Sequence, residues 1–463
     1  MNIHNETLSK IATHKFSRCD LSYWIFQDRA TSASVCSLKD LFYFINGTVQ
    51  TKYYTDEITD KPYIRVGDVT KKYGISYENL IYLNEECEIN EEKLLKENDL
   101  VITTIGSIIG KVGRVKNLAG GTHSNNTVVL RPKNKDINVG FYEKLLQTDG
   151  YAEYLFASSS KKAQPNLQQY DLENIVMPLV DAKIQQQILT HIARIEKKIQ
   201  TLKSQIAPIQ ETIDTVFARE FGFDYAEFER VKAIKSYTIG IDDCANNPDL
   251  RFSAKFHRAA GGYVMRELNR ITEKKIKNYI AEPIFLGASI SPKNYDDNGD
   301  YYYLSMATIK KWGFDEEDAT LTSIDYSDNK AEKTVKKGDI ILARSGEGTI
   351  GKVALIEDDE LKAIFADFTM RIRLENYNPK LAYYYMRTAY FQYLIEIYKK
   401  GLGNNTNIFP IVIQELPLPN LSLEDQHRIV GEIQKEIDKQ NEIRNNVAEL
   451  RRKIDEIIEN VLN

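Results

Sequence analysis

The residues that come closest to a chemical motif form a glycine-rich segment in the second half of the chain. Gly346-Glu-Gly348-Thr-Ile-Gly351-Lys-Val353 matches G-x-G-x-x-G-x-V, a pattern of loops that cover phosphates in kinases and, more loosely, in dinucleotide folds. Such a loop should be accompanied by further kinase motifs or lead into a helix. Here Lys352-Val-Ala-Leu-Ile has the composition of a strand. We therefore favour a strand–turn–strand hairpin whose glycines supply positive φ angles.

No catalytic constellation accompanies this segment. The sequence has no Walker lysine loop, no Gly-x-Ser-x-Gly, no paired-histidine zinc motif and no Asn-Pro-Pro-Tyr or Asp-Pro-Pro-Tyr motif of adenine methylation. The four cysteines and six histidines are scattered, which favours neither a zinc site nor a disulfide framework. We expect a protein that is not an enzyme, holds no metal and uses no cofactor of its own.

Polar and basic residues gather at the expected turns of both halves, where Lys and Arg can hold DNA phosphates and Arg, Asn, Ser and Thr can contact base edges. The candidates in the first half are Lys71, Lys72, Thr103, Thr104, Ser107, Lys111, Lys161, Lys162 and Asn166. Those in the second half are Lys310, Lys311, Arg344, Ser345, Glu347, Thr349, Lys352, Lys399, Lys400, Asn404 and Asn405. Each alone is explained as a solvated loop residue, so the argument for DNA depends on the clusters recurring in both halves.

The elements that must position these residues form a tandem repeat. Asp99–Val112 returns as Asp339–Val353, with the same offset at Asp99/Asp339 and Gly106/Gly346 and a one-residue slip at Gly110/Gly351. Three further segment pairs follow the same plan: Tyr63–Gly74 with Tyr302–Gly313, a helix over Tyr142–Phe156 with Leu381–Tyr398, and Asn166–Pro178 with Asn405–Pro417. A duplicated domain indicates a target that itself has two parts.

Each half leads into a long helix with a periodic apolar face. The apolar residues of the first alternate in steps of four and three, and the second has a more polar middle around Gln440. The first predicted seam runs from Ile188 to Val216, and the second from Val430 to Val461. The core positions that we expect are Ile192, Ile195, Ile199, Leu202, Ile206, Ile209, Ile433, Ile437, Val447, Leu450, Ile454 and Ile457. This spacing is typical of a coiled coil. Pro208 lies inside the first seam and should kink or restart the helix.

The order of the elements predicts an α+β protein with two similar domains, each a mixed β-sheet with short helices. The expected boundaries are 1–180 for the first domain, 181–220 for the central helix, 221–420 for the second domain and 421–463 for the C-terminal helix. If the two seams pair, the helices must run antiparallel, and the domains are related by an approximate two-fold axis. The alternative is that each helix only covers its own domain.

Composition limits the class of protein only weakly. The 463 residues carry a formal net charge of −5, which counts mildly against nucleic acid but is compatible with a basic face. No apolar run approaches the roughly 20 residues that span a bilayer. The N-terminal residues lack the features of a signal peptide. A cytoplasmic protein is expected.

With these motifs in order, the chain resembles the specificity subunit of type I restriction–modification systems. The resemblance covers nearly the whole chain. Its sharpest parts are Lys337-Gly-Asp-Ile-Ile-Leu-Ala-Arg-Ser-Gly346, similar to the central hairpin of the family, and Leu416-Pro-Leu-Pro through Leu423-Glu-Asp-Gln-His-Arg-Ile-Val430, similar to its helix entry. The first half departs from both. Thr104 replaces Arg344, and Lys183-Ile-Gln185 replaces the Glu-Asp-Gln form, so the two halves need not share a contact residue at the hairpin.

The resemblance implies a division of labour. Each globular half would be a target recognition domain for one half-site of an asymmetric, double-stranded DNA target, and the coiled coil would set the spacer. Its outer faces would bind two methyltransferase subunits that carry S-adenosylmethionine. Restriction and translocase subunits that use ATP would join them.

Three other functions stay open from the residues alone. The chain could be a nucleotide-dependent transferase that uses the Gly346 loop, a coiled-coil scaffold that binds only protein, or the DNA-reading subunit of a fused methyltransferase–nuclease system. Nucleotide binding that is lost in Gly348→Ala would support the first. Failure to retard any DNA, even with methyltransferase partners present, would favour the second.

Overall fold

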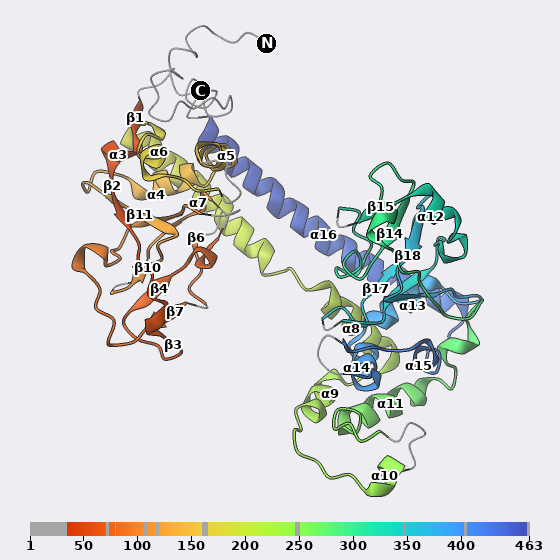
Figure 1. Cartoon of the computed structure of the whole chain (residues 1–463). Helices are drawn as coiled ribbons and strands as arrows, with labels where there is room; N and C mark the ends of the chain where they lie inside the picture. The colour runs from red at the N-terminus through yellow and green to blue at the C-terminus, as the bar shows by residue number, and fades with distance from the viewer. Residues whose placement is uncertain are drawn as a thin grey trace. The chain divides into compact units, whose positions relative to one another are not determined.

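Two compact units make up the chain (Figure 1). The computed structural model describes residues 35–460 except 71–73, 79, 106–108, 117, 119, 160–164, 246–250, 318, 347 and 402–404. The first unit comprises residues up to Gln205 together with those from Arg444 onward, and the second unit comprises Ile206–Ile443. No helix within the described ranges is long and apolar enough to cross a membrane.

The first unit contains two four-stranded sheets with the strand orders β10-β4-β7-β3 and β2-β11-β8-β9. Its strands are β1 Val35–Ser37, β2 Phe42–Asn46, β3 Tyr54–Thr55, β4 Pro62–Ile64, β5 Val69–Thr70, β6 Gly74–Ile75, β7 Ile81–Leu83, β8 Leu100–Thr103, β9 Val112–Arg114, β10 Thr122–His123, β11 Thr127–Pro132 and β12 Val176–Pro178. Its helices are α3 Leu38–Leu41, α4 Val139–Leu146, α5 Asp149–Ser158, α6 Gln169–Glu173 and α7 Ala182–Lys203.

The second unit repeats this plan with the strand orders β13-β19-β16-β17 and β15-β14-β18. Its strands are β13 Phe285–Leu286, β14 Tyr301–Leu304, β15 Thr320–Thr322, β16 Ile340–Ala343, β17 Val353–Leu355, β18 Ala363–Phe365 and β19 Thr369–Ile372. Its helices are α8 Ile209–Phe221, α9 Tyr225–Lys232, α10 Ile241–Ala245, α11 Ala259–Ile271, α12 Ile324–Asp328, α13 Pro379–Arg387, α14 Ala389–Tyr398 and α15 Pro410–Ile413. Helix α16, Leu423–Glu459, contributes residues to both units.

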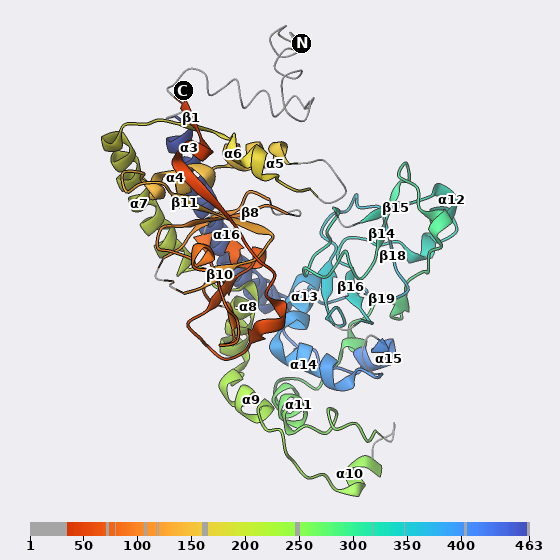
Figure 2. The ribbon, with the colours of Figure 1, turned by 60° about the vertical axis from the view of Figure 1, so that its left-hand side comes forward.

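The hairpin sheets of the two units match strand for strand, β2-β11-β8-β9 with β13-β19-β16-β17, whereas the other sheet has four strands in the first unit and three in the second. In each unit an antiparallel sheet contains the hairpin, β8–β9 or β16–β17. In each, a parallel pair, β4–β10 or β14–β18, belongs to the other sheet. The predicted α+β class and the internal duplication are therefore confirmed. Figure 2 also shows α9 and α11 side by side in the second unit, an addition that has no counterpart among the described elements of the first.

One helix prediction needs correction in each unit. The segment predicted as a single helix over 142–156 is two helices, α4 and α5, and its repeat is α13 and α14. The cause is a threonine that caps the second helix of each pair: the hydroxyl of Thr148 accepts a hydrogen bond from the backbone N–H of Tyr151, and Thr388 does the same for Phe391. Both threonines have extended backbone angles, which end the preceding helix.

Pro208 restarts the central helix and does not merely kink it. Helix α7 ends at Lys203, and α8 begins at Ile209 with Pro208 as its N-cap residue. The side-chain Oε1 of Gln440 on α16 accepts a hydrogen bond from the backbone N–H of Ala207 at 2.9 Å. Gln440 is 7% exposed. The polar middle of α16 therefore supplies a buried acceptor for a backbone N–H that has no helical partner at the break.

Helix α16 packs antiparallel to α7 in the first unit and to α8 in the second. In the first unit, Ile188 and Ile192 of α7 share a buried cluster with Ile458. In the second unit, α8 runs against the start of α16, since Glu220 pairs with Arg428 at 2.7 Å and Arg219 pairs with Glu432 at 2.5 Å. These exposed pairs contribute little stability, so the apolar residues hold the helices together.

The expected coiled-coil positions lie on the packed faces of these helices. Five of them are buried, namely Ile192, Ile199, Ile433, Ile437 and Val447. The others are partly buried, namely Ile195, Leu202, Ile206, Ile209, Leu450, Ile454 and Ile457. Ile192, Ile433 and Ile437 lie in the apolar clusters of their units, and Ile209, Ile454 and Ile457 pack against those clusters.

A buried histidine in the first unit leads to a prediction about pH. His123 is fully buried, its Nδ1 lies 2.9 Å from the hydroxyl oxygen of Thr127, and its Nε2 has no partner. Burial, together with the charges of Lys93 and Arg131, lowers the pKa of His123 to about 4 from the ordinary 6.5. The unfolded chain therefore binds more protons between these two values, and stability should fall as the pH drops through that window.

Replacing His123 with phenylalanine should remove this pH-dependent part of the stability, since phenylalanine does not titrate. Phenylalanine should fit the site, because Phe365 pairs with Leu304 in the second unit as His123 pairs with Ile64 in the first. We expect the wild-type chain to lose about 2–3 kcal/mol more than His123→Phe between pH 7 and pH 4. Urea denaturation of both proteins across this range measures the difference. Parallel curves would show that His123 does not titrate as described.

Candidate nucleic-acid interface

A buried carboxylate anchors the first strand of each hairpin. Asp99 accepts hydrogen bonds from Nε and Nη2 of Arg131 at 3.0 and 2.8 Å. Asp339 accepts the same pair from Arg373 at 2.6 and 2.7 Å. Both carboxylates are fully buried. Arg131 lies in β11, and Arg373 directly follows β19. Each bidentate pair therefore joins the hairpin to its neighbouring strand and fixes the base from which the turn extends.

The glycine-rich segment forms the predicted hairpin turn. Strand β16 pairs with β17 in antiparallel register, with Ile340 opposite Leu355. Gly346, Gly348 and Gly351 all have φ between 84° and 86°, the left-handed region that a side chain disfavours. In the first unit Gly110 has φ 79° at the same turn. Conformation therefore accounts for these glycines without a bound nucleotide.

A second segment lies against the hairpin of the second unit. Ser345 forms a β-bridge with Asn407, and its hydroxyl donates to the carbonyl oxygen of Thr406 at 3.0 Å. The backbone N–H of Ile408 donates to the carbonyl oxygen of Arg344 at 2.9 Å. Lys400 also pairs with Asn407 through backbone hydrogen bonds. The candidates from the two segments are thereby brought together.

The loop after β14 lies on the hairpin as well. The hydroxyl of Thr349 lies 3.7 Å from the sulfur of Met306. The ammonium of Lys352 lies 3.9 Å from the ring centroid of Trp312. This loop carries Lys310 and Lys311, both exposed. Three chain segments that are far apart in sequence thus form one surface around the turn.

The side chains of these second-unit candidates differ in availability. Arg344 is partly buried, and its Nε donates to the carbonyl oxygen of Asp367 at 3.0 Å. Ser345 is buried. Lys311 pairs with Asp315, and Lys399 pairs with Glu396 at 2.6 Å. Lys310 and Asn405 are exposed. Among these sequence-based candidates, the exposed residues and the partly buried Arg344 and Lys352 are the better ones for contact with DNA.

In the first unit the two threonine candidates are internal. Thr103 is fully buried and its hydroxyl accepts from the backbone N–H of Lys111 at 3.0 Å. Thr104 is buried and its hydroxyl donates to the carbonyl oxygen of Asn126 at 3.1 Å. Both hydroxyls stabilise the hairpin and are not presented at its surface. Asn166 forms a β-bridge with Ile105, beside the same turn.

Seven candidates cannot be placed. They lie outside the described residues and are Lys71, Lys72, Ser107, Lys161, Lys162, Glu347 and Asn404.

Backbone bridges and hydrogen bonds to backbone carbonyls correct the predicted alignment of the two halves. Asn166 bridges the hairpin as Asn407 does, so Asn407, and not Asn405, has its place in the second unit. Likewise the hydroxyl of Tyr63 donates to the carbonyl oxygen of Thr48 at 2.5 Å as Tyr303 donates to Ala288 at 2.7 Å, so Tyr63 corresponds to Tyr303 and not to Tyr302. Matching letters missed this shift, because backbone pairing and not side-chain identity sets the register.

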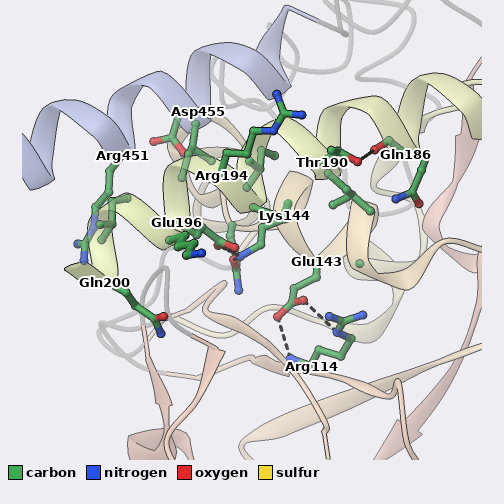
Figure 3. Close-up of a pocket in the computed structure, with 18 of the residues that line it drawn as sticks. Arg114, Glu143, Lys144, Gln186, Thr190, Arg194, Glu196, Gln200, Arg451 and Asp455 are labelled. Carbon is green, nitrogen blue, oxygen red and sulfur yellow. Dashed lines mark hydrogen bonds and ion pairs between the residues drawn. The ribbon is translucent and has the colours of Figure 1, made fainter. Parts of the chain in front are cut away.

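A basic hollow of about 980 Å³ lies beside α7 in the first unit (Figure 3). Its charged lining consists of Arg114, Lys116, Lys144, Arg194, Lys197, Lys203 and Arg451, against Glu143, Glu196 and Asp455. Lys144 pairs with Glu196 at 2.5 Å and Arg114 pairs with Glu143 at 3.1 Å. None of the sequence-based candidates for DNA contact lines it, although the expected coiled-coil positions Ile192, Ile199 and Ile454 do. Tyr384 of the second unit has the place of Lys144, four residues before the capping threonine. Its hydroxyl donates a hydrogen bond of 3.0 Å to the side-chain oxygen of Gln434 on α16.

Three residues near the hairpin of the second unit were missed from the sequence: Trp312, Arg387 and Asn407. Arg387 lies on a predicted helix and gave no signal. Trp312 is one of only two tryptophans and follows Lys310-Lys311, which could have drawn attention to it. Contacts across the fold, not local pattern, bring these residues to the hairpin.

The family of the chain follows from a comparison of its sequence with known protein families. The type I restriction modification DNA specificity domain, Methylase_S, matches residues 33–211 and again residues 268–450. The chain belongs to this family. Its two DNA specificity domains include the two hairpin sheets described above, and a chain of this organisation reads a two-part DNA target. No curated protein matches the sequence.

Solved structures show a likeness to this specificity protein in fold. A chain from work on complex assembly and conformational transition of the type I R-M system aligns with a TM-score of 0.52 at 15% identity, covering 93% of this chain and 97% of that one. The type I restriction–modification S subunit from M. genitalium gives 0.39 at 12%, covering 93% and 96%. The HsdS subunit from Thermoanaerobacter tengcongensis gives 0.38 at 14%, covering 93% and 97%.

Proposed function

We propose that this specificity protein is the noncatalytic DNA-reading subunit of a type I restriction–modification complex, and that each domain contacts one half-site through the surface around its hairpin. The observation that carries the proposal is the repeated sheet of β8–β9 and β16–β17, built with the same strand order in both domains of a DNA specificity family. The candidate contacts differ between the two copies, as expected if the half-sites differ in sequence.

The proposed partners follow from this role. Two methyltransferase subunits that carry S-adenosylmethionine would bind the outer faces of α7 and α16, and restriction subunits that use ATP would join them. A structurally similar chain comes from work on complex assembly of the type I R-M system, which supports such partners. Methylation profiling of a host genome, with and without this gene and its partner methyltransferase, tests the proposal. Two modified half-sites at a fixed spacing are expected. No change in methylation would contradict it.

The helices are also proposed to set the spacer between the half-sites. A heptad lengthens a helix by about 10 Å, which corresponds to about three base pairs of duplex. Inserting one heptad in α7 and one in the matching part of α16 should therefore lengthen the preferred spacer by about three base pairs and leave both half-sites unchanged. Methylation profiling of the variant measures this. Sites that kept the original spacer would exclude the helices as the determinant.

A further inference from the structure

Two cationic side chains of the second domain share one aromatic ring. The ammonium of Lys352 lies 3.9 Å from the ring centroid of Trp312, and the guanidinium carbon of Arg387 lies 5.2 Å from it. Lys352 directly follows the last glycine of the hairpin turn, whereas Arg387 ends α13. A ring attracts each cation separately, but the two cations repel each other.

Neither cation has a carboxylate partner among the residues that the structure describes. Arg387 is 7% exposed, its Nη1 donates to the hydroxyl of Tyr383 at 2.7 Å, and its Nε has no partner. Burial, and then the charge of Arg387, lowers the pKa of Lys352. Burial raises the pKa of Asp214 and the charge of Arg387 acts against this shift, but the two described side chains form no ion pair. The Asp214 carboxylate instead accepts a hydrogen bond of 2.8 Å from the backbone N–H of Ala389. A partly desolvated pair of positive charges is costly unless an anion joins it.

The backbone holds the shared ring in place at some cost. Trp312 has a φ of 65°, an uncommon value for a bulky residue. Its carbonyl oxygen accepts a hydrogen bond of 2.5 Å from the hydroxyl of Tyr383, the same group that accepts from Arg387. Tyr383 therefore joins the ring and the guanidinium in one arrangement. The ammonium of Lys352 lies on this fixed platform, beside the hairpin.

We propose that Lys352 and Arg387 form a phosphate-contact site for duplex DNA in the second domain, and that Trp312 is the positioning residue that holds the Lys352 ammonium toward the phosphate. The inference depends on the proposed function, since it assumes that the hairpin surface faces DNA. Phosphate would supply the missing negative charge and offset the repulsion between the two cations.

The first domain has only half of this arrangement. Lys111 follows Gly110 at its hairpin, as Lys352 follows Gly351. The residue before the capping threonine is Gln147 in place of Arg387, and its side-chain amide donates to the carbonyl oxygen of Val112 at 2.9 Å. Arg387→Gln therefore gives the second domain the residue that the first already accommodates, which makes it a matched test variant.

The test measures the affinity of the full chain for a duplex that carries the mapped target, between 50 and 200 mM salt. Each phosphate contact contributes about 0.9 to the slope of log affinity against log salt, or about a 3.5-fold change over this range. Lys352→Met and Arg387→Gln should each lower the slope by about that amount. Trp312→Leu should do the same as Lys352→Met, whereas Trp312→Tyr, which keeps an aromatic face, should retain most of the slope.

Two further variants separate positioning from general damage. Lys439→Met removes an equal charge from an exposed position of α16 and should leave the slope unchanged. The double variant Trp312→Leu/Lys352→Met should have the slope of Lys352→Met alone. An unchanged slope in Lys352→Met would overturn the phosphate site while target binding by the wild-type chain still supported the proposed function. Weaker binding of Trp312→Leu at every salt concentration, with a wild-type slope, would overturn the positioning role. Absence of target binding by the wild-type chain would overturn both proposals.

Discussion

Replacing Asp339 with alanine is expected to lower the free energy of unfolding of the second unit by about 3–5 kcal/mol. The substitution leaves the guanidinium of Arg373 partly buried without its bidentate partner and removes the acceptor for the backbone N–H of Lys336 at 2.8 Å. Hydrogen exchange of the β16 and β19 amides measures the loss locally, which suits a chain of two units better than one global unfolding curve.

Controls for this variant come from both units. Asp359→Ala breaks a pair with Lys337 in which the carboxylate is 70% exposed, and should change stability by less than about 1 kcal/mol. Asp99→Ala should reproduce the large effect in the first unit, where Arg131 holds the equivalent carboxylate. If Asp339→Ala resembled Asp359→Ala, the buried pair would not be the anchor of the hairpin.

Replacing Gly287 with alanine is expected to cost the second unit about 3 kcal/mol. An added methyl group would overlap the carbonyl oxygens of Phe365 and Ala366, and these atoms belong to the backbone and cannot rotate away. Gly47 has the same environment in the first unit, against the carbonyl oxygen of Ser124. In both places the backbone of the next residue donates to the adjoining strand, from Thr48 to His123 and from Ala288 to Phe365.

Gly313→Ala is the matched control, because an added methyl group at Gly313 meets only open space and its φ is not positive. Hydrogen exchange of the β13 and β18 amides, measured alongside thermal or urea unfolding, should show lower stability for Gly287→Ala than for Gly313→Ala. Equal stability of Gly287→Ala and Gly313→Ala would show that the close approach of the two backbones is relaxed in solution.

The sequence made the duplication, the hairpins and the packed helix faces predictable, because each depends on a local pattern. Asp99 and Asp339 start matching β-rich runs, glycines mark the turns, and isoleucine spacing marks the helix faces. The two capping threonines, Thr148 and Thr388, were visible as residues but not recognised as helix boundaries. A single apolar pattern continues across each of them, so periodicity alone predicts one helix.

The candidate interface was predictable only in part. Lysines in turns are readily identified, yet Thr103, Thr104 and Ser345 were selected with them and are buried inside the fold. Composition does not show whether a hydroxyl faces solvent or closes a turn, because both uses favour the same residue type.

The sequence by itself determined that two similar α+β domains alternate with helices, and that the chain resembles a DNA specificity protein. Tertiary structure alone decided that Asn407 corresponds to Asn166 and that Gln440 accepts a hydrogen bond from the backbone at the break in the central helix. It also decided that Lys352 and Arg387 both lie near the ring of Trp312. The physical reason is that periodicity and turn chemistry act over a few neighbouring residues, whereas backbone pairing and side-chain contact join residues separated by tens to hundreds of positions.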